Sequence, residues 1–252
     1  MTFKDGATTL GTATIAGGKA VYSTYSLSVG THNISVVYGG STVYSGSTST
    51  PATITINKES TTTSLTTSGL SVAFGTALTF TAIAKQVAPG VAVPSGSIQF
   101  FDGTTSLGSI AVDGSGKATL AISNLSVGTH SIKATYLGNI NVATSNSAVV
   151  TQTITKAKPT VTLSATATTI TVGQSDTFTA TVVGVAAAAP TGNVTFYDGT
   201  TVLGTVALAG GSASFNTSSL TIGNHTIKAI YAGDGNYLSV TSTTITVAVS
   251  AH

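Results

Sequence analysis

The chain contains no cysteine, so it has neither a disulfide framework nor a thiolate for catalysis or metal binding. It also contains no arginine, and its nine basic residues are scattered lysines. Nucleic-acid binding needs clustered basic side chains that displace counterions, so the composition argues against a nucleic-acid partner. Only 6% of the residues are charged and the formal net charge is +2, so Ser and Thr hydroxyls must supply most of the solubility.

Long apolar runs are absent as well. No stretch of 18 apolar residues occurs, so we expect no membrane insertion. Residues 1–6 include no apolar segment of the signal-peptide type, and an export signal would have to lie outside this sequence. Small exported animal domains usually carry disulfides. A cysteine-free chain rich in Ser, Thr, Gly, Ala and Val instead favours a bacterial cell-surface or extracellular location.

What the chain does contain is a long internal repeat. An Asp-Gly pair returns after 97 and again after 96 residues, and a Gly-x-His triplet returns after 98 and 95 residues. A solenoid repeat is usually about 20–50 residues long, whereas a period near one hundred fits a small all-β domain. The sequence therefore predicts a partial first unit that lacks its initial strands, a complete second unit and a complete third unit, at residues 1–57, 58–156 and 157–252.

The third unit shows how each repeat should fold. Residues 176–183 alternate apolar and polar side chains, which is the period of a half-buried strand. Asp198-Gly199 predicts a two-residue type I′ hairpin turn, and no segment has a helical period. Short strands separated by turn signals predict an Ig-like β-sandwich. The expected strands are 160–164, 169–172, 176–183, 194–197, 202–208, 213–220, 225–231 and 237–249.

The junctions between units are short. Residues 54–59 and 154–159 are not flexible Gly/Ser linkers. We expect the last strand of one unit to run into the first strand of the next, which would give an elongated rod with limited bending.

Taken together, residues 194–199, 203–204, 220–231 and 233–237 resemble the bacterial Ig-like domain repeats of large surface and secreted, adhesin-like proteins. The resemblance covers nearly the whole chain in two and a half copies. It implies a β-sandwich that serves as a stalk, spacer or adhesin scaffold outside the cell, without catalytic residues or cofactors. The segment 233–237 differs in the other units, so a function of Asp234 would not be shared by all of them.

The repeated histidine begins a core-facing row on its strand, and the same row ends in a tyrosine. We expect the ring to donate a hydrogen bond to nearby backbone, much as the tyrosine corner does in Ig-like sandwiches. Catalysis or metal ligation would need partner side chains that the local sequence does not offer. The structural candidates in these rows are His32, His130, His225, Tyr38, Tyr136 and Tyr231.

The repeated acidic residue is assigned to a turn, because each Asp is isolated from other acids and calcium needs several oxygen ligands. Asp234, in an acidic loop, is the one metal candidate, but Lys58 and the pair Lys156 and Lys158 stand where further ligands would be needed. No nucleophile elbow of the G-x-S-x-G type stands at a strand-to-helix turn, so we expect no enzyme. The turn candidates are Asp5, Gly6, Asp102, Gly103, Asp198 and Gly199.

The incomplete first unit leaves three explanations open: an excerpt of a longer array, completion by strands of another chain, or disorder. Half a sandwich would expose Phe3, Leu10, Ile34 and Tyr38. The main functional hypothesis is a structural spacer whose partners are neighbouring repeats. The alternatives are an adhesin module that contacts carbohydrate or a host protein, and a filament or surface-layer subunit that associates through the first unit.

Overall fold

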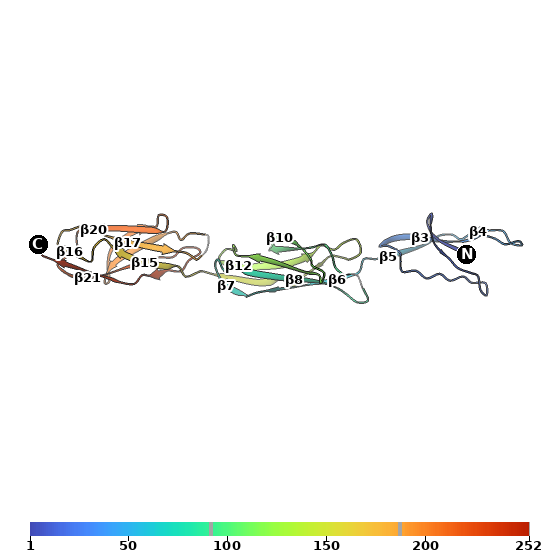
Figure 1. The fold of residues 1–252 in the computed structure, drawn as a ribbon, viewed down its shortest axis with the longest axis horizontal. Helices are drawn as coiled ribbons and strands as arrows, with labels where there is room; N and C mark the ends of the chain where they lie inside the picture. The colour runs from blue at the N-terminus through green and yellow to red at the C-terminus, as the bar shows by residue number, and fades with distance from the viewer. Residues whose placement is uncertain (91–92, 186–187, 252) are drawn as a thin grey trace.

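The computed structural model describes residues 1–90, 93–185 and 188–251, so the predicted end of the third unit at His252 lies outside the described residues. All regular elements in these ranges are β-strands. The units follow one another along a single axis and form an elongated rod, with the first unit at one end and the C-terminus at the other (Figure 1). The predicted tandem all-β architecture is confirmed. Among the described residues, no helix has the length and apolar character needed to span a membrane.

The third unit is a sandwich of two sheets. The larger sheet has the order β16-β23-β21-β18-β19, with β22 paired to β21, and the smaller sheet has the order β15-β17-β20. The strands are β15 (Thr160–Ala165), β16 (Thr169–Thr171), β17 (Asp176–Val183), β18 (Asn193–Asp198), β19 (Thr201–Ala207), β20 (Ser212–Thr217), β21 (Gly223–Tyr231), β22 (Val240–Thr241) and β23 (Ile245–Ser250).

Alternation along the strands builds the core of this sandwich. On β17, Phe178 and Ala180 are fully buried, while the intervening Thr179 faces outward. From the other sheet, Phe196 and Tyr231 are also fully buried. Removing these apolar surfaces from water is the main force that holds the two sheets together.

The second unit repeats this arrangement. Its larger sheet has the order β10-β9-β12-β14-β7, with β13 paired to β12, and its smaller sheet is β11-β8-β6. The strands are β6 (Thr61–Thr67), β7 (Ser71–Ala73), β8 (Leu78–Gln86), β9 (Ser97–Asp102), β10 (Thr105–Ala111), β11 (Lys117–Ile122), β12 (Gly128–Tyr136), β13 (Ser145–Asn146) and β14 (Val150–Thr155).

The first unit consists of one sheet of five strands, with the order β2-β1-β3-β4 and β5 paired to β3. Residues 1–57 contain no counterpart of the three-stranded sheet found in the other units. The strands are β1 (Thr2–Asp5), β2 (Thr8–Thr12), β3 (Gly30–Tyr38), β4 (Ser47–Thr48) and β5 (Ala52–Ile56).

A tyrosine partly covers the open face of the first unit. The Tyr22 ring stacks on Phe3 with centroids 5.4 Å apart, and its hydroxyl donates to the Leu10 carbonyl at 2.5 Å. The expectation that Phe3, Leu10, Ile34 and Tyr38 would be exposed was correct only in part: all four are half-buried, whereas the equivalent Phe100, Ile132 and Tyr136 of the second unit are fully buried.

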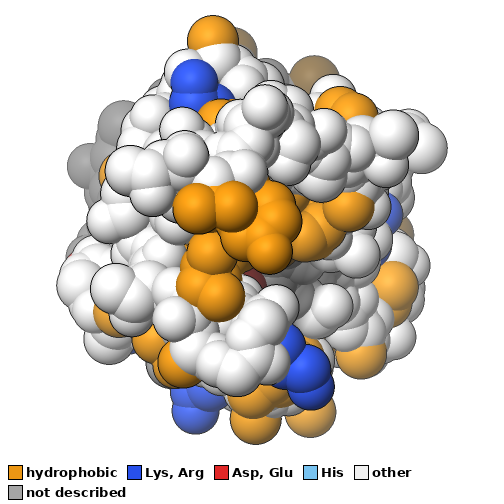
Figure 2. Space-filling view, turned by 90° about the vertical axis from the view of Figure 1, so that its right-hand side faces the viewer, with side chains coloured by type: hydrophobic (Ala, Val, Ile, Leu, Met, Phe, Trp, Pro, Cys, Tyr) orange, Lys and Arg blue, Asp and Glu red, His pale blue; other side chains and the backbone are white. Residues whose placement is uncertain are grey.

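Hydrophobic side chains remain at the outer end of this unit. Figure 2 shows them gathered in the middle of the end face. Large exposed apolar side chains of the first unit include Val21, Tyr25, Val43 and Tyr44. Exposed apolar side chains thus gather at this end of the described rod.

The predicted last strand 237–249 is interrupted, which corrects the sequence interpretation. Residues between β22 and β23 leave the ladder at Ser242, whose Oγ accepts the Ala229 N–H at 3.0 Å. The same hydroxyl donates to the Thr243 carbonyl at 2.7 Å. Ser147 and Ser49 accept the equivalent backbone N–H groups in the other units. A serine hydroxyl thus replaces a regular ladder bond at this break in every unit.

The junctions also differ from expectation. Strand β14 ends at Thr155 and β15 begins at Thr160, so the strands are not continuous. The linker residue Ala157 instead forms a parallel bridge with Tyr237 of the third unit. Its N–H donates to the Asn236 carbonyl, and its own carbonyl accepts the Leu238 N–H, both at 2.9 Å. The linker is therefore held by the loop of the following unit.

Candidate functional site

The repeated histidine and the repeated Asp-Gly pair meet in each unit. In the third unit, His225 Nδ1 lies 2.6 Å from Asp198 Oδ2, and His225 Nε2 lies 2.7 Å from the Thr221 carbonyl oxygen. The other carboxylate oxygen, Asp198 Oδ1, accepts the Thr226 N–H at 3.1 Å. We call this arrangement of a histidine, an aspartate and a backbone carbonyl the His–Asp clasp.

The clasp has nearly the same geometry in all three units. The Nδ1–carboxylate distance is 2.6 Å in each, and the histidine and aspartate are 27, 28 and 27 residues apart. In the first unit His32 pairs with Asp5 and the Ser28 carbonyl (2.8 Å), and in the second unit His130 pairs with Asp102 and the Ser126 carbonyl (2.9 Å).

Strand pairing brings these side chains together. Asp198 is the last residue of β18 and lies opposite Ile227 on β21, two residues beyond His225. On its other side Asp198 lies opposite Thr201, so Gly199 and Thr200 are the two central turn residues. Gly199 has φ +56°, and no described non-glycine residue has a positive φ. The predicted type I′ turn centred on Asp198-Gly199 was therefore wrong, because a positive φ at the first central position alone is typical of type II′.

Hydrogen bonding changes the acidity of the clasp. The hydrogen bond to Asp5 raises the pKa of His32, and the hydrogen bond to Asp198 does the same for the pKa of His225. Burial opposes the change most strongly at His130, but the Ser126 carbonyl and the Asp102 carboxylate outweigh it, so the pKa is raised there too. In return, the bond from His32 lowers the pKa of Asp5. An ion pair thus favours the protonated ring in every unit.

The tyrosine at the end of the histidine row has a different environment in each unit. Tyr136 is fully buried and its hydroxyl donates to the Ser95 carbonyl at 2.6 Å. Tyr231 is equally buried, but its hydroxyl forms no hydrogen bond with any residue that the structure describes. Burial, reinforced by the nearby Asp234 carboxylate, raises the pKa of Tyr231 to about 12. Tyr38 is half-buried in the open first unit. In the two complete units this tyrosine is therefore part of the hydrophobic core.

The metal candidate Asp234 uses both carboxylate oxygens within the protein. Oδ1 accepts the N–H groups of Asn236 and Tyr237, and Oδ2 accepts the N–H and hydroxyl of Thr191. Burial opposes ionisation, but these donors outweigh it and lower the pKa of Asp234 to about 2. Among the residues that the structure describes, no group of three or more His, Asp or Glu side chains is placed to hold a metal ion.

The other units build the same loop with different residues. Asn139 Oδ1 accepts the N–H groups two and three residues later, at 2.8 and 2.9 Å. Ser41 Oγ accepts the corresponding N–H groups in the first unit, at 3.2 and 3.1 Å. Asp, Asn and Ser all make such local turns, because each has a short side chain with an acceptor oxygen. The loop thus needs an acceptor oxygen at this position, and a negative charge is optional.

Two lysines of the linkers donate hydrogen bonds to these loops. Lys58 Nζ donates to the Asn139 carbonyl at 2.6 Å, and Lys156 Nζ donates to the Asp234 carbonyl. Across the junction, Phe74 of the second unit packs edge-on against Tyr237 of the third, with ring centroids 5.9 Å apart. Phe74 is 9% exposed and Tyr237 is fully buried. An aromatic contact and a lysine hydrogen bond therefore fix the second junction.

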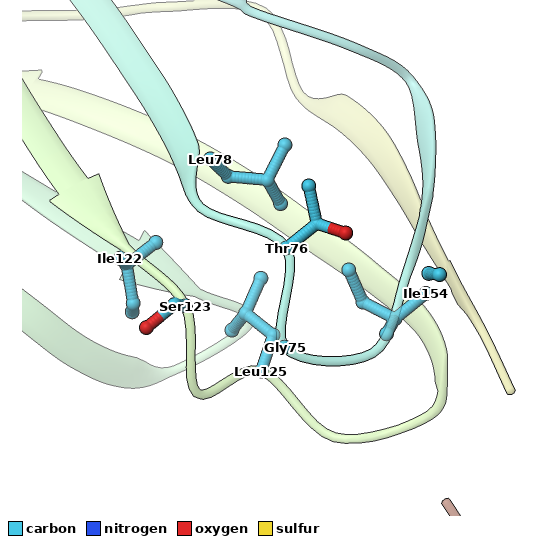
Figure 3. A pocket seen from close by; sticks show the side chains of 8 residues that line it. Gly75, Thr76, Leu78, Ile122, Ser123, Leu125 and Ile154 are labelled. Carbon is cyan, nitrogen blue, oxygen red and sulfur yellow. The ribbon is translucent and has the colours of Figure 1, made fainter. Parts of the chain in front are cut away.

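A small hollow in the second unit offers no ligand site. It lies between β8, the end of β11 and β14, where Leu78, Ile122, Leu125 and Ile154 surround it (Figure 3). The space does not admit even a water molecule. This hollow is therefore the closed end of the hydrophobic core.

A second polar pair was not anticipated. Thr67 Oγ1 donates to Gln152 Oε1 at 3.0 Å, which links the first and last long strands of the second unit. Gln152 is fully buried and lies directly opposite His130. The third unit has Ala165 and Val247 at these positions, as the strand registers show. The pair is thus a special feature of the second unit.

Sequence comparison identifies the family. The chain matches the family described as bacterial Ig-like domain (group 3) over residues 1–57, 65–155 and 163–250. These segments cover most of the chain, and the protein therefore belongs to this family of tandem bacterial Ig-like domains. Among curated proteins, no sequence matches it significantly.

Solved structures with similar folds come from several bacteria. The adhesin InvE of Yersinia pseudotuberculosis is 17% identical, with a TM-score of 0.37, and the match covers 73% of this chain and 58% of that one. The Escherichia coli adhesin FdeC is 13% identical (TM-score 0.31, 88% of this chain and 74% of that one). The fibronectin(III)-like modules of Clostridium thermocellum CbhA are 20% identical (TM-score 0.31, 74% of this chain and 93% of that one). The family assignment rests on the sequence match alone.

Proposed function

We propose that the chain is a non-catalytic spacer segment of a bacterial extracellular or cell-surface protein, with units that begin at residues 1, 58 and 157. The contact between Phe74 and Tyr237 carries this proposal, because it joins two successive units end to end. The carboxylate of each clasp aspartate is hydrogen-bonded to the histidine of the same unit. The carboxylate of Asp234 accepts backbone N–H groups of its own loop. These groups therefore serve to stabilise the individual units. The immediate partners of each unit are the neighbouring units of the array.

Small-angle X-ray scattering tests whether the second junction is stiff. The parent chain should scatter as a monomeric, extended particle with a narrow range of shapes. Phe74→Ala should broaden this range, because the ring that contacts Tyr237 is lost. Phe101→Ala is a matched control in the same unit, since this ring lies beside Lys133, 5.7 Å from its Nζ, and is not the ring that contacts Tyr237. A parent chain that already bends freely would overturn the spacer proposal.

An adhesin role is the second candidate, and exposed aromatic side chains favour it. The Tyr25 side chain is fully exposed and Tyr44 is 71% exposed, both in the first unit. Aromatic rings of this kind can pack on sugar rings or on a protein surface. Binding of the chain to glycan arrays or host cells, lost in Tyr25→Ala or Tyr44→Ala, would support this role. Concentration-dependent fibres in light scattering would instead favour self-association through the first unit.

A further inference from the structure

We propose that each His–Asp clasp holds an extra proton at neutral pH, with both ring nitrogens protonated, and opens when that proton is lost. The three clasps would then make every unit less stable as the solution becomes alkaline. This behaviour is a property of the fold and does not depend on whether the array serves as a spacer or an adhesin.

The geometry around each ring carries the inference. Nδ1 faces a carboxylate oxygen at 2.6 Å, and Nε2 faces a backbone carbonyl oxygen at 2.8, 2.9 and 2.7 Å in successive units. A carbonyl oxygen can only accept a hydrogen bond, and so can an ionised carboxylate. A neutral imidazole has one N–H, so one of its two contacts would set a lone pair against a lone pair. Only a ring with two N–H groups satisfies both contacts.

The aspartate is suited to remain ionised beside such a ring. In the second unit, Asp102 Oδ1 accepts the Ser131 N–H at 3.1 Å while Oδ2 faces the ring. Hydrogen bonds to a carboxylate favour its charged form. The equivalent N–H groups in the other units belong to Asn33 and Thr226. Every clasp therefore combines a carboxylate with a doubly protonated ring.

No other charged group in the described residues competes for these rings. The strand opposite each histidine presents an uncharged residue, which is Ile54, Gln152 or Val247. The nearby lysines on the histidine strands, Lys133 and Lys228, lie over Phe101 and Tyr197. The aspartate is thus the one charged partner, and the raised pKa of all three histidines agrees with this arrangement.

The sign of the pH effect follows from the raised pKa. Since the folded ring binds its proton more tightly than the unfolded one, the stabilisation is fully present below the pKa of an unfolded histidine, near 6.5. It is lost as the pH rises through the higher pKa of the folded state. A deprotonated ring must give up one of its two contacts, which releases either the Asp-Gly turn or the loop before the histidine strand.

The clasps also lie near the end of the unit from which the chain leaves. Gly128, two residues before His130, pairs with Ile154 at the end of β14, just before the linker. Gly30 likewise pairs with Ile56, just before Lys58. Opening of a clasp would thus loosen the part of each unit that adjoins the next linker.

Nitrogen NMR of the histidine rings tests the proposal directly, without altering the clasp. In a His252→Ala background only the three clasp histidines remain. Both ring nitrogens should show the protonated signature at pH 7, and all three midpoints should lie above that of the urea-unfolded chain. A neutral ring at pH 7, with one unprotonated nitrogen, or midpoints equal to those of the unfolded chain would overturn the proposal.

Thermal unfolding between pH 6 and pH 8.5 tests the consequence. The parent melting temperature should fall by ~2–5 °C over this interval. The triple variant Asp5→Asn, Asp102→Asn, Asp198→Asn is the matched control, because an amide can donate to Nδ1 and accept the backbone N–H around a neutral ring. Its melting temperature should change less with pH. Protonated rings combined with a flat parent profile would overturn the pH-dependent opening, and the NMR result stands even if the triple variant does not fold.

Discussion

The hydroxyl of Thr67 donates a hydrogen bond to the side-chain carbonyl of Gln152, 3.0 Å away, and thereby ties the first strand of the second unit to its last. The third unit achieves the same strand arrangement with two apolar residues, Ala165 and Val247. The fold does not require this polar link. Its contribution therefore depends on whether both partners are present.

Removing Thr67 alone should lower the free energy of unfolding more than removing both partners of this pair. Thr67→Ala leaves the fully buried Gln152 Oε1 without a donor, which should lower the free energy of unfolding by ~1–3 kcal/mol. Gln152→Val should lower the free energy of unfolding less than Thr67→Ala does, because the Thr67 hydroxyl is half-buried and can turn toward water. The double variant, which copies the third unit, should be more stable than the sum of the single losses predicts. Urea denaturation gives this cycle, and strict additivity would contradict the coupling.

Loss of the linker lysine should loosen the second junction. In Lys156→Met the Asp234 carbonyl loses its ammonium donor. We expect the amides of Ala157 and Leu238, which bridge linker and loop, to exchange about two- to fivefold faster, equivalent to ~0.5–1 kcal/mol. Lys158→Met is the matched control, because Lys158 is an exposed lysine in the same linker. Equal exchange rates in the two variants would show that the linker is held by its backbone alone.

Asp234 should make the third unit sensitive to acid. Its pKa is about 2 in the folded protein and 3.8 is the ordinary value, so the stabilisation is present above pH 4 and is lost as the pH falls toward 2. Asp234→Asn keeps the acceptor oxygen for Asn236 and Tyr237 but loses the charge. Its melting temperature should therefore fall less between pH 4 and pH 2 than that of the parent chain. Parallel acid profiles of parent and variant would refute this role of the carboxylate.

The sequence was sufficient to predict the sandwich because period-2 alternation and turn residues are local signals. The alternation over 176–183 predicts β17 with the bounds observed, Asp176–Val183. The break at Ser242 was missed, since a hydroxyl that replaces a ladder bond leaves the residue pattern of a strand unchanged. The hairpin was predicted one residue too early, because its central residues are Gly199 and Thr200, and its turn type depends on a backbone register that the residues do not reveal.

The clasp was only half predictable. The histidine and the aspartate were each recognised as repeated and structural, but their contact spans 27 or 28 residues and depends on how β18 lies beside β21. The near-constant separation of the two residues in three units was the signal available in the sequence. Docking of the linker at Ala157 was missed because alanine offers no distinctive side chain, and its bonds are made by the backbone.

The loops closed by Ser41, Asn139 and Asp234 have a further consequence for how such repeats can diverge. Because the turn asks only for an oxygen acceptor, one codon change can add or remove a negative charge beside a linker without altering the backbone there. Copies of a duplicated domain can thus acquire different surface potentials while their spacing stays the same. Mutational drift at this position would tune how neighbouring molecules attract or repel one another.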